Sequence, residues 1–168
     1  MIYSQRNRAK LFILAIACLC MVGSALFIQV QFHEDPCPLC ILQRYLFILT
    51  ALLARTAASL KTRHLMYFLA GLGALSAIIG AILAAKQILI QIKSTFSCGF
   101  DLLGPFVDGL PPAHWLPSVF RVSGLCETVY PPIFGLSLPT WSLIGFVSAF
   151  TMLVYLVIAQ YSSLFLRG

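Results

Sequence analysis

Four long apolar stretches, separated by polar or proline-rich segments, set the pattern of this chain. A helix needs about 20 predominantly apolar residues, within a range of roughly 17–25, to cross a bilayer. The stretches therefore predict four spanning helices, of which the second is the shortest. Their approximate bounds are Leu11–Val30, Leu39–Ala54, Leu65–Ala85 and Trp141–Leu164, and the connections 31–38 and 93–140 lie on one side of the membrane.

Composition agrees with this pattern. Hydrophobic residues make up 60% of the chain, charged residues make up 10%, and the mean hydropathy is +0.95. These values are typical of an integral membrane protein. We expect an all-α integral membrane protein, a four-transmembrane-helix bundle with a long proline-rich outer loop, built as a single membrane domain over residues 1–168.

The charged residues divide between two sides of the membrane. Basic residues flank the spans in segments that contain no acid, namely Arg6, Arg8, Lys10, Arg55, Lys61, Arg63 and Arg167. All five acids lie in the other two connections, namely Glu34, Asp35, Asp101, Asp108 and Glu127. Because Lys and Arg favour the cytoplasmic side, both termini are expected inside and the acidic connections outside. This distribution explains the net charge of +6 without nucleic-acid binding.

The first span has the basic start of a signal peptide. Its apolar core, however, exceeds the usual ~7–15 residues, and Gln29–Asp35 offers no small-residue cleavage pattern. We therefore expect a retained helix.

The connection Lys93–Thr140 holds seven of the nine prolines. It cannot be one long helix, because proline disrupts helix interiors. It is also too short to be expected to form an independent core. The sequence therefore predicts an extended, mobile loop stapled by one disulfide. Within it, the apolar segment His114–Phe120 either lies along the membrane surface or packs against the bundle as a plug.

The six cysteines divide by position. Cys18 and Cys20 are two residues apart within the first span, so their side chains diverge and they are interpreted as small apolar filler. The other four lie at or beyond the outer face, namely Cys37, Cys40, Cys98 and Cys126. An even number of thiols on the oxidising side indicates two disulfides, whichever way they are connected. Zinc is disfavoured, since Cys98 and Cys126 are 28 positions apart and form no second close pair.

Cys37-Pro38-Leu39-Cys40 stands where the second apolar stretch begins. Pro38 suits the first helical position, which places Cys37 near the N-cap and Cys40 in the first turn, where a thiolate is favoured. Arg44 shares the face of Cys40 and lies about 6 Å deeper by helical rise. A cation in a span costs roughly 2.5–3.5 kcal/mol, so we expect it to stabilise a thiolate or a reduced anionic cofactor. A structural disulfide and a snorkelling arginine are the alternatives.

Three groups of residues together match the pattern of a known family. They are the string Pro36-Cys37-Pro38-Leu39-Cys40-Ile41-Leu42-Gln43-Arg44, the later cysteines Cys98 and Cys126, and the segments Trp115-Leu116-Pro117 and Leu138-Pro139-Thr140-Trp141. From the first span to the fourth, the chain closely resembles the bacterial inner-membrane disulfide bond formation protein B (DsbB) family. The resemblance implies a quinone-dependent thiol oxidase that reoxidises the periplasmic dithiol oxidase DsbA.

The resemblance also assigns roles to individual residues. Cys37 and Cys40 would form the pair facing the quinone, with Cys40 beside the ring and Arg44 as the assisting cation. Cys98 and Cys126 would form the pair that reoxidises DsbA, and Cys98 would be attacked first. Electrons would pass between the pairs by thiol–disulfide exchange.

Localisation and cofactor follow from the same resemblance. It implies the bacterial inner membrane, periplasmic cysteine pairs, and ubiquinone or menaquinone as the acceptor. Lys86 and Gln87, at the outer end of the third span, are further candidates for contacts to a quinone head group. An ordinary interfacial boundary explains these two residues as well.

Three other interpretations remain open from the sequence. A reductase of the vitamin K epoxide reductase type also combines membrane spans with two cysteine pairs, but there the loop pair precedes the membrane CxxC. A DsbB variant could serve one dedicated partner. A non-enzymatic membrane subunit or small transporter could carry both pairs as structural disulfides and use Arg44 as a substrate or packing charge.

Overall fold

The computed structural model describes residues 2–33, 35–93, 100–126 and 132–165. Four long helices form its body, namely α1 (Ile2–Phe32), α2 (Pro38–Ser59), α3 (Arg63–Ile92) and α7 (Leu138–Phe165). Each contains a segment long and apolar enough to cross a membrane. The described residues form no strand beyond an isolated bridge between Ile133 and Leu136. The predicted all-α bundle with four spans is therefore confirmed.

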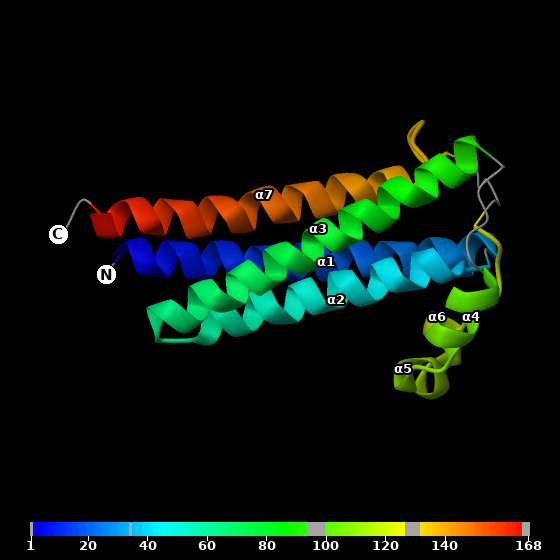
Figure 1. Cartoon of the computed structure of the whole chain (residues 1–168), viewed down its shortest axis with the longest axis horizontal. Helices are drawn as coiled ribbons and strands as arrows, with labels where there is room; N and C mark the ends of the chain where they lie inside the picture. The colour runs from blue at the N-terminus through cyan, green and yellow to red at the C-terminus, as the bar shows by residue number, and fades with distance from the viewer. Residues whose placement is uncertain (1, 34, 94–99, 127–131, 166–168) are drawn as a thin grey trace.

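The four long helices run side by side along the long axis of the molecule (Figure 1). The first turns of α1 and the last turns of α7 lie at one end, and the start of α2 lies at the other. α3 packs against both α2 and α7, and α1 packs against α2, whereas α1 and α7 make much less contact. The seam between α1 and α7 is therefore the loosest part of the bundle.

Small residues bring the helices close together. Ala51, Ala54 and Ala57 of α2 are buried in the central core with Ala74 and Ala77 of α3. Without a hydrophobic driving force between helices in lipid, such close approach supplies the packing contacts that hold them together.

Three further contacts fix how neighbouring helices pack. A Cβ on Gly80 of α3 would overlap the ring of Phe146 of α7, which stacks on Phe47 of α2 with ring centroids 3.7 Å apart. Glycine is therefore required at position 80 if α3 and α7 are to approach this closely. Between α2 and α3, the buried hydroxyls of Thr50 and Ser76 form a hydrogen bond.

All four long helices extend beyond the predicted apolar stretches, and two of these extensions lie at the C-terminal ends of α2 and α3. α2 continues past Ala54 to Ser59, and α3 continues past Ala85 to Ile92. The extension of α3 carries Gln87, which is buried and hydrogen-bonded to α2. The hydropathy pattern placed the end of the third span at Ala85, but the polar residue Gln87 lies within the helix and is buried against α2.

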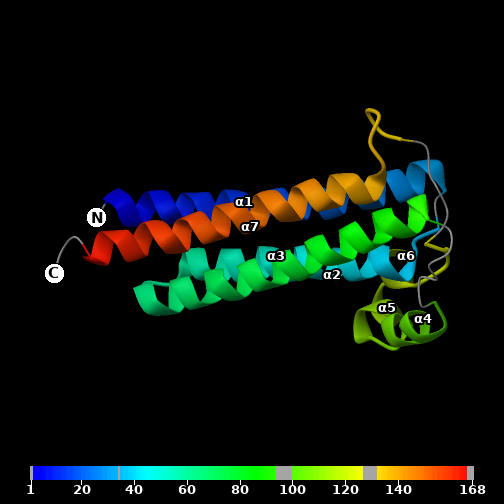
Figure 2. The same cartoon turned by 45° about the horizontal axis from the view of Figure 1, so that its top comes forward.

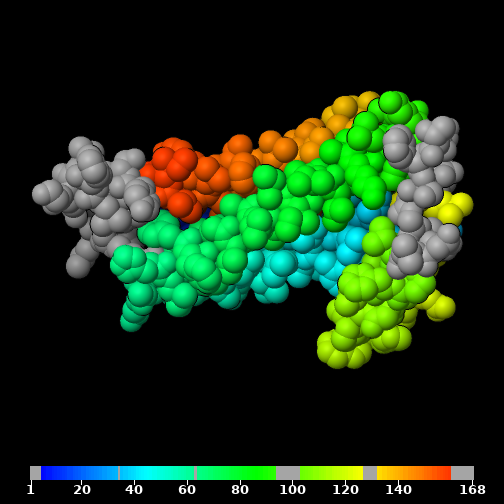
Figure 3. Space-filling view, viewed as in Figure 1, coloured from blue at the N-terminus to red at the C-terminus, as the bar shows by residue number. Residues whose placement is uncertain are grey.

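Residues 100–120 of the long connection are mostly helical, so the expectation of an extended loop is wrong for this part. Three short helices occur, namely α4 (Phe100–Asp108), α5 (Pro111–Trp115) and α6 (Pro117–Phe120). Prolines occupy the first turns of α5 and α6, where a missing N–H is no loss. The three helices project beside α2 from the end of the bundle where α2 begins (Figures 2 and 3). This end, which the sequence predicts to face outward, is called the outer end.

Residues 114–120 combine features of both expected arrangements. Phe120 is buried and stacks on Tyr45 of α2, with ring centroids 4.8 Å apart. Ala113 and Val107 are buried in the same cluster with Ile41 of α2. Trp115, by contrast, is 78% exposed. One side of the unit formed by α4, α5 and α6 therefore packs on the bundle, and the other side carries exposed apolar side chains.

Candidate active site

The CxxC motif begins α2 as the sequence predicts. Cys37 is the N-cap residue and Pro38 occupies the first helical position. The Cys37 sulfur accepts a hydrogen bond of 3.3 Å from the main-chain N–H of Cys40. The cap thus satisfies one of the N–H groups that a helix leaves free at its start, and it fixes both sulfurs at the outer end of the bundle.

The two sulfurs are chemically unequal. Both are free thiols, and the Cys37 thiol donates to the Cys40 sulfur over 2.8 Å. This hydrogen bond, followed by burial, raises the pKa of Cys37 well above its ordinary value. Cys37 therefore keeps its proton, and negative charge is better stabilised on Cys40, the acceptor of the bond.

A pair of amides lies beside the sulfurs. The Gln87 Nε2 group donates to the Cys40 sulfur at 3.0 Å and lies 3.5 Å from the Cys37 sulfur. Its Oε1 accepts a hydrogen bond of 2.6 Å from Nε2 of Gln43. Both glutamines are almost fully buried. The structure thus brings the predicted residue Gln87 to Cys40, together with Gln43, to which the sequence analysis assigned no role.

Arg44 is buried one turn deeper than Cys40. Its Nη1 donates a hydrogen bond of 2.6 Å to the main-chain carbonyl oxygen of Val119 in α6. Gln29 of α1 donates to the preceding carbonyl, that of Ser118, at 3.0 Å. Side chains of α1 and α2 therefore hold α6 in place, a contact between distant segments that the sequence did not predict.

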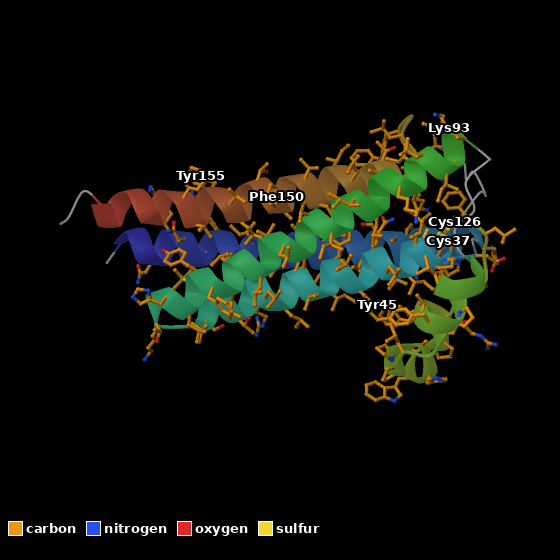
Figure 4. All side chains as sticks on the ribbon, in the orientation of Figure 1. Cys37, Tyr45, Lys93, Cys126, Phe150 and Tyr155 are labelled. Carbon is orange, nitrogen blue, oxygen red and sulfur yellow. The ribbon has the colours of Figure 1, made fainter. Side chains whose placement is uncertain are left out.

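Cys126 lies beside Cys37. Both are buried in one cluster with Leu39 and Ile90, and Figure 4 shows the two cysteines next to each other at the outer end. The main-chain N–H groups of Ser123 and Gly124 donate to the carbonyl oxygen of Pro36, each at 3.1 Å, which holds the two segments together.

The redox states of the described cysteines also differ. Cys126 is disulfide-bonded, whereas Cys37 and Cys40 are free thiols. Cys98, predicted as the first target of DsbA, lies outside the described residues.

A cavity of about 310 Å³ adjoins Cys40 at the outer part of the seam between α1 and α7. Its apolar walls include Met21, Val22 and Ile28 of α1, Phe47 of α2, and Leu138 and Trp141 of α7. Its polar lining includes Gln29, Asp35, Gln43, Arg44, Gln87 and Gln91. Cys40 is among the lining residues, but Cys37 is not, so the two sulfurs of the motif face different surroundings.

The remaining cysteines and polar candidates lie elsewhere. Lys86 is exposed and is not among the residues that line the cavity. Cys18 is buried in the core and Cys20 is exposed, and both are free, as expected for filler within a span.

Sequence reasoning assigned no role to the cavity glutamines Gln29, Gln43 and Gln91. The available signal was their position, because polar residues at membrane depth usually mark functional sites.

Cys40 lines a cavity between the spanning helices, and Cys37 lies beside Cys126 of the long connection. These features define a membrane thiol–disulfide oxidoreductase. The comparisons identify which one. Residues 7–157 match the family described as disulfide bond formation protein DsbB. A disulfide bond formation protein B of Burkholderia thailandensis is 51% identical over 142 residues, which cover 84% of each chain. The disulfide bond formation protein B 2 of Burkholderia lata is 48% identical over 157 residues, covering 94% of this chain and 92% of the relative.

A more distant relative, the disulfide bond formation protein B 1 of Pseudomonas fluorescens, is 46% identical over 142 residues and 84% of each chain. The chain therefore belongs to the DsbB family. It is a protein dithiol:quinone oxidoreductase that acts in disulfide bond formation by oxidising DsbA. Family membership decides against a vitamin K epoxide reductase-type enzyme and against a non-enzymatic subunit.

Proposed function

We propose that two electrons enter from a periplasmic DsbA-type dithiol at Cys98–Cys126, pass to Cys37–Cys40, and leave from Cys40 to a membrane quinone. One observation carries this order. Cys37 shares a buried cluster with Cys126, whereas Cys40 lines the cavity. Cys98 is proposed as the disulfide partner of Cys126, since the other four cysteines are free.

The first half of the cycle oxidises the partner. A thiolate of the partner attacks Cys98, forms a mixed disulfide and releases Cys126 as a thiolate. The partner's second thiolate then attacks its own bound sulfur and releases Cys98. The partner has lost two electrons and is oxidised, and the loop pair is reduced.

The second half moves these electrons to the membrane pair. The Cys126 thiolate attacks Cys37 of the oxidised Cys37–Cys40 pair, and Cys40 leaves as a thiolate. Cys98 then attacks Cys126 and releases Cys37, which restores the loop disulfide. The resulting dithiol gives two electrons and two protons to a quinone, yielding quinol and the Cys37–Cys40 disulfide.

The cavity residues fit a quinone, the substrate that accepts the electrons. Apolar walls suit a ring and a lipid tail, and Arg44 can donate to a carbonyl oxygen that gains negative charge. The Oε1 atom of Gln29 is buried and has no partner among the residues that the structure describes. It can accept a hydrogen bond from a hydroxyl of the quinol product. Ubiquinone and menaquinone both offer these groups.

The proposed orientation places both cysteine pairs in the periplasm and both termini in the cytoplasm. It is supported by the acids of the outer connections and by the Lys and Arg residues near the opposite ends of the spans. After the loop disulfide is reduced in spheroplasts, a membrane-impermeant thiol reagent should label Cys98 and, more slowly, Cys126, which is buried beside Cys37. Labelling only after membrane disruption would overturn the orientation.

The relay is tested with purified full-length protein, a reduced DsbA-type partner, and ubiquinone or menaquinone added separately. The wild type should oxidise the partner and form quinol in equal amounts. Cys98→Ser and Cys126→Ser should stop partner oxidation, and Cys40→Ser should stop quinol formation. Cys20→Ser, which alters a free cysteine within α1, is the matched control and should behave as wild type. Normal partner oxidation in Cys126→Ser would show that the relay is wrong.

Exchange between the pairs has its own test. In Cys40→Ser, Cys37 remains a free thiol beside disulfide-bonded Cys126, so exchange requires no added oxidant. Cys37 should form a disulfide with Cys126, and Cys98, the proposed former partner of Cys126, should be released as a thiol. Peptide mapping of the non-reduced protein detects this bond. Its absence at equilibrium, in a correctly folded variant, would contradict direct transfer between Cys126 and Cys37.

A further inference from the structure

Gln43 and Gln87 form the most buried polar contact near the reacting sulfurs. Gln43 is 4% exposed and Gln87 is 3% exposed, and they belong to different helices, α2 and α3. A buried amide is costly unless its groups are hydrogen-bonded. The contact joins Gln43 Nε2 to Gln87 Oε1 over 2.6 Å. It therefore fixes which side of the Gln87 amide faces the cysteines.

A glutamine amide can take either of two orientations about its last bond, with the oxygen and the NH₂ group exchanged. With Oε1 held by Gln43, the NH₂ group faces the sulfurs, 3.0 Å from Cys40 and 3.5 Å from Cys37. In the opposite orientation, the amide oxygen would lie against a sulfur that becomes negatively charged. That arrangement is repulsive, whereas an N–H donor stabilises an anion.

We propose that Gln43 is a positioning residue for the reducing thiolate, because its amide holds Gln87 in the orientation that directs an N–H group at the Cys40 sulfur. The amide of Gln43 donates to Gln87, whose own amide donates to the sulfurs, so Gln43 acts through Gln87. The proposal rests on the proposed function in one respect, namely that Cys40 is the thiol that delivers electrons to the quinone. It adds a residue for which the sequence analysis assigned no role.

The test follows the reactivity of Cys40 without any quinone. The reduced full-length protein in detergent is alkylated with N-ethylmaleimide over a range of pH, and the modified Cys40 peptide is quantified by mass spectrometry. Gln87→Met removes the donor and should move the midpoint of the alkylation profile to higher pH by about one unit, since a hydrogen bond to an anion changes its proton affinity roughly tenfold. Gln43→Met should shift the midpoint in the same direction.

The decisive comparison is the double variant. If Gln43 acts only through Gln87, then Gln43→Met should have no further effect in the Gln87→Met background. Equal shifts in both backgrounds, or no shift from Gln43→Met alone, would overturn the proposal. Gln43→Asn keeps an amide but is one methylene shorter, so it should behave like Gln43→Met with less disturbance to folding.

Thr50→Val is the matched control. It removes a different buried hydrogen bond between α2 and α3, the one to Ser76, away from the sulfurs. It should leave the alkylation profile unchanged, so a shift there would assign the effect to loosened packing and overturn the proposal. Failure of the proposed function appears separately, as absence of quinone-dependent partner oxidation in the wild type whatever its alkylation profile.

Discussion

The guanidinium of Arg44 donates a 2.6 Å hydrogen bond to the carbonyl oxygen of Val119, so a buried cation of α2 holds the short helix α6. Tyr45, the next residue, stacks on Phe120, the next residue of α6. Arg44 also lines the cavity beside Cys40. A guanidinium has five N–H donors in a fixed fork, so the Arg44 side chain can hold α6 and still donate to a ligand.

Arg44 variants should separate these two roles. Arg44→Lys keeps a charge but loses the fork, and Arg44→Ala loses both. We expect the KM for quinone to rise roughly 10- to 100-fold in Arg44→Ala, the range for a lost charge-assisted hydrogen bond, and to rise less in Arg44→Lys. The measurement is quinone-dependent DsbA oxidation in membranes that contain equal amounts of each variant.

Arg55→Ala is the control for Arg44, since Arg55 is the other arginine of α2 and is exposed. It should leave the KM for quinone unchanged. Exchange between DsbA and the loop disulfide should persist in all three variants. Unchanged quinone dependence in Arg44→Ala would leave Arg44 with the structural role alone.

Cys37 should be the less reactive thiol of the pair. Its pKa is raised by the hydrogen bond to the Cys40 sulfur and then by burial. A raised pKa keeps the thiol protonated to higher pH, so little Cys37 thiolate should form between about pH 6 and 9, where an ordinary cysteine ionises. Alkylation followed by peptide mapping should modify Cys40 first throughout this range. In Cys40→Ala, the main cause of the raised pKa is gone, and Cys37 should react faster at each pH. Equal labelling of both thiols in the wild type would contradict this order.

Gly80 should tolerate no larger side chain. A Cβ there would overlap the ring of Phe146, so Gly80→Ala forces α3 and α7 apart. Overpacking of this kind costs about 1–3 kcal/mol, and the thermal unfolding temperature in detergent should fall. Gly71→Ala is the control in the same helix, because a Cβ at position 71 meets no atom within 4 Å. It should leave the temperature unchanged or raise it, and an equal loss in both variants would show that the contact with Phe146 is not the cause.

Local rules predicted much of this protein. Apolar stretches long enough to cross a bilayer gave the four spans, and Pro38 placed Cys37 at the N-cap and Cys40 in the first turn. These features depend on residues close together in the sequence.

The remaining features depend on how distant segments meet. Gln43 and Gln87 are 44 residues apart, and Arg44 and Val119 are 75 residues apart. Such contacts require the rotation of each helix about its axis, which hydropathy does not determine. The hydropathy pattern also predicted that the third span ends at Ala85, whereas α3 continues to Ile92. Hydropathy cannot distinguish a polar residue at the membrane surface from one buried against another helix, as Gln87 is against α2.

Gly124 should control transfer between the two cysteine pairs. A Cβ at this position would overlap the main-chain carbonyl of Asp35. The neighbouring N–H groups of Ser123 and Gly124 both donate to the carbonyl of Pro36. Cys37 follows Pro36 directly, and Cys126 follows Gly124 after one intervening residue. Gly124→Ala should therefore push the segments apart and separate Cys126 from Cys37.

The expected result is slower exchange between the pairs while the reaction of Cys40 with quinone is unchanged. Thiolate attack requires the two sulfurs to come into contact, and a misplacement of about 1 Å can cost roughly 100-fold in rate. Rapid-mixing experiments on the protein, with DsbA and quinone varied separately, distinguish the two steps. Gly104→Ala is the matched control, because Gly104 lies in the same connection and a Cβ there meets no atom within 4 Å. If Gly124→Ala exchanged electrons between its pairs as fast as Gly104→Ala, the close approach of residues 35–37 and 123–126 would not limit the relay.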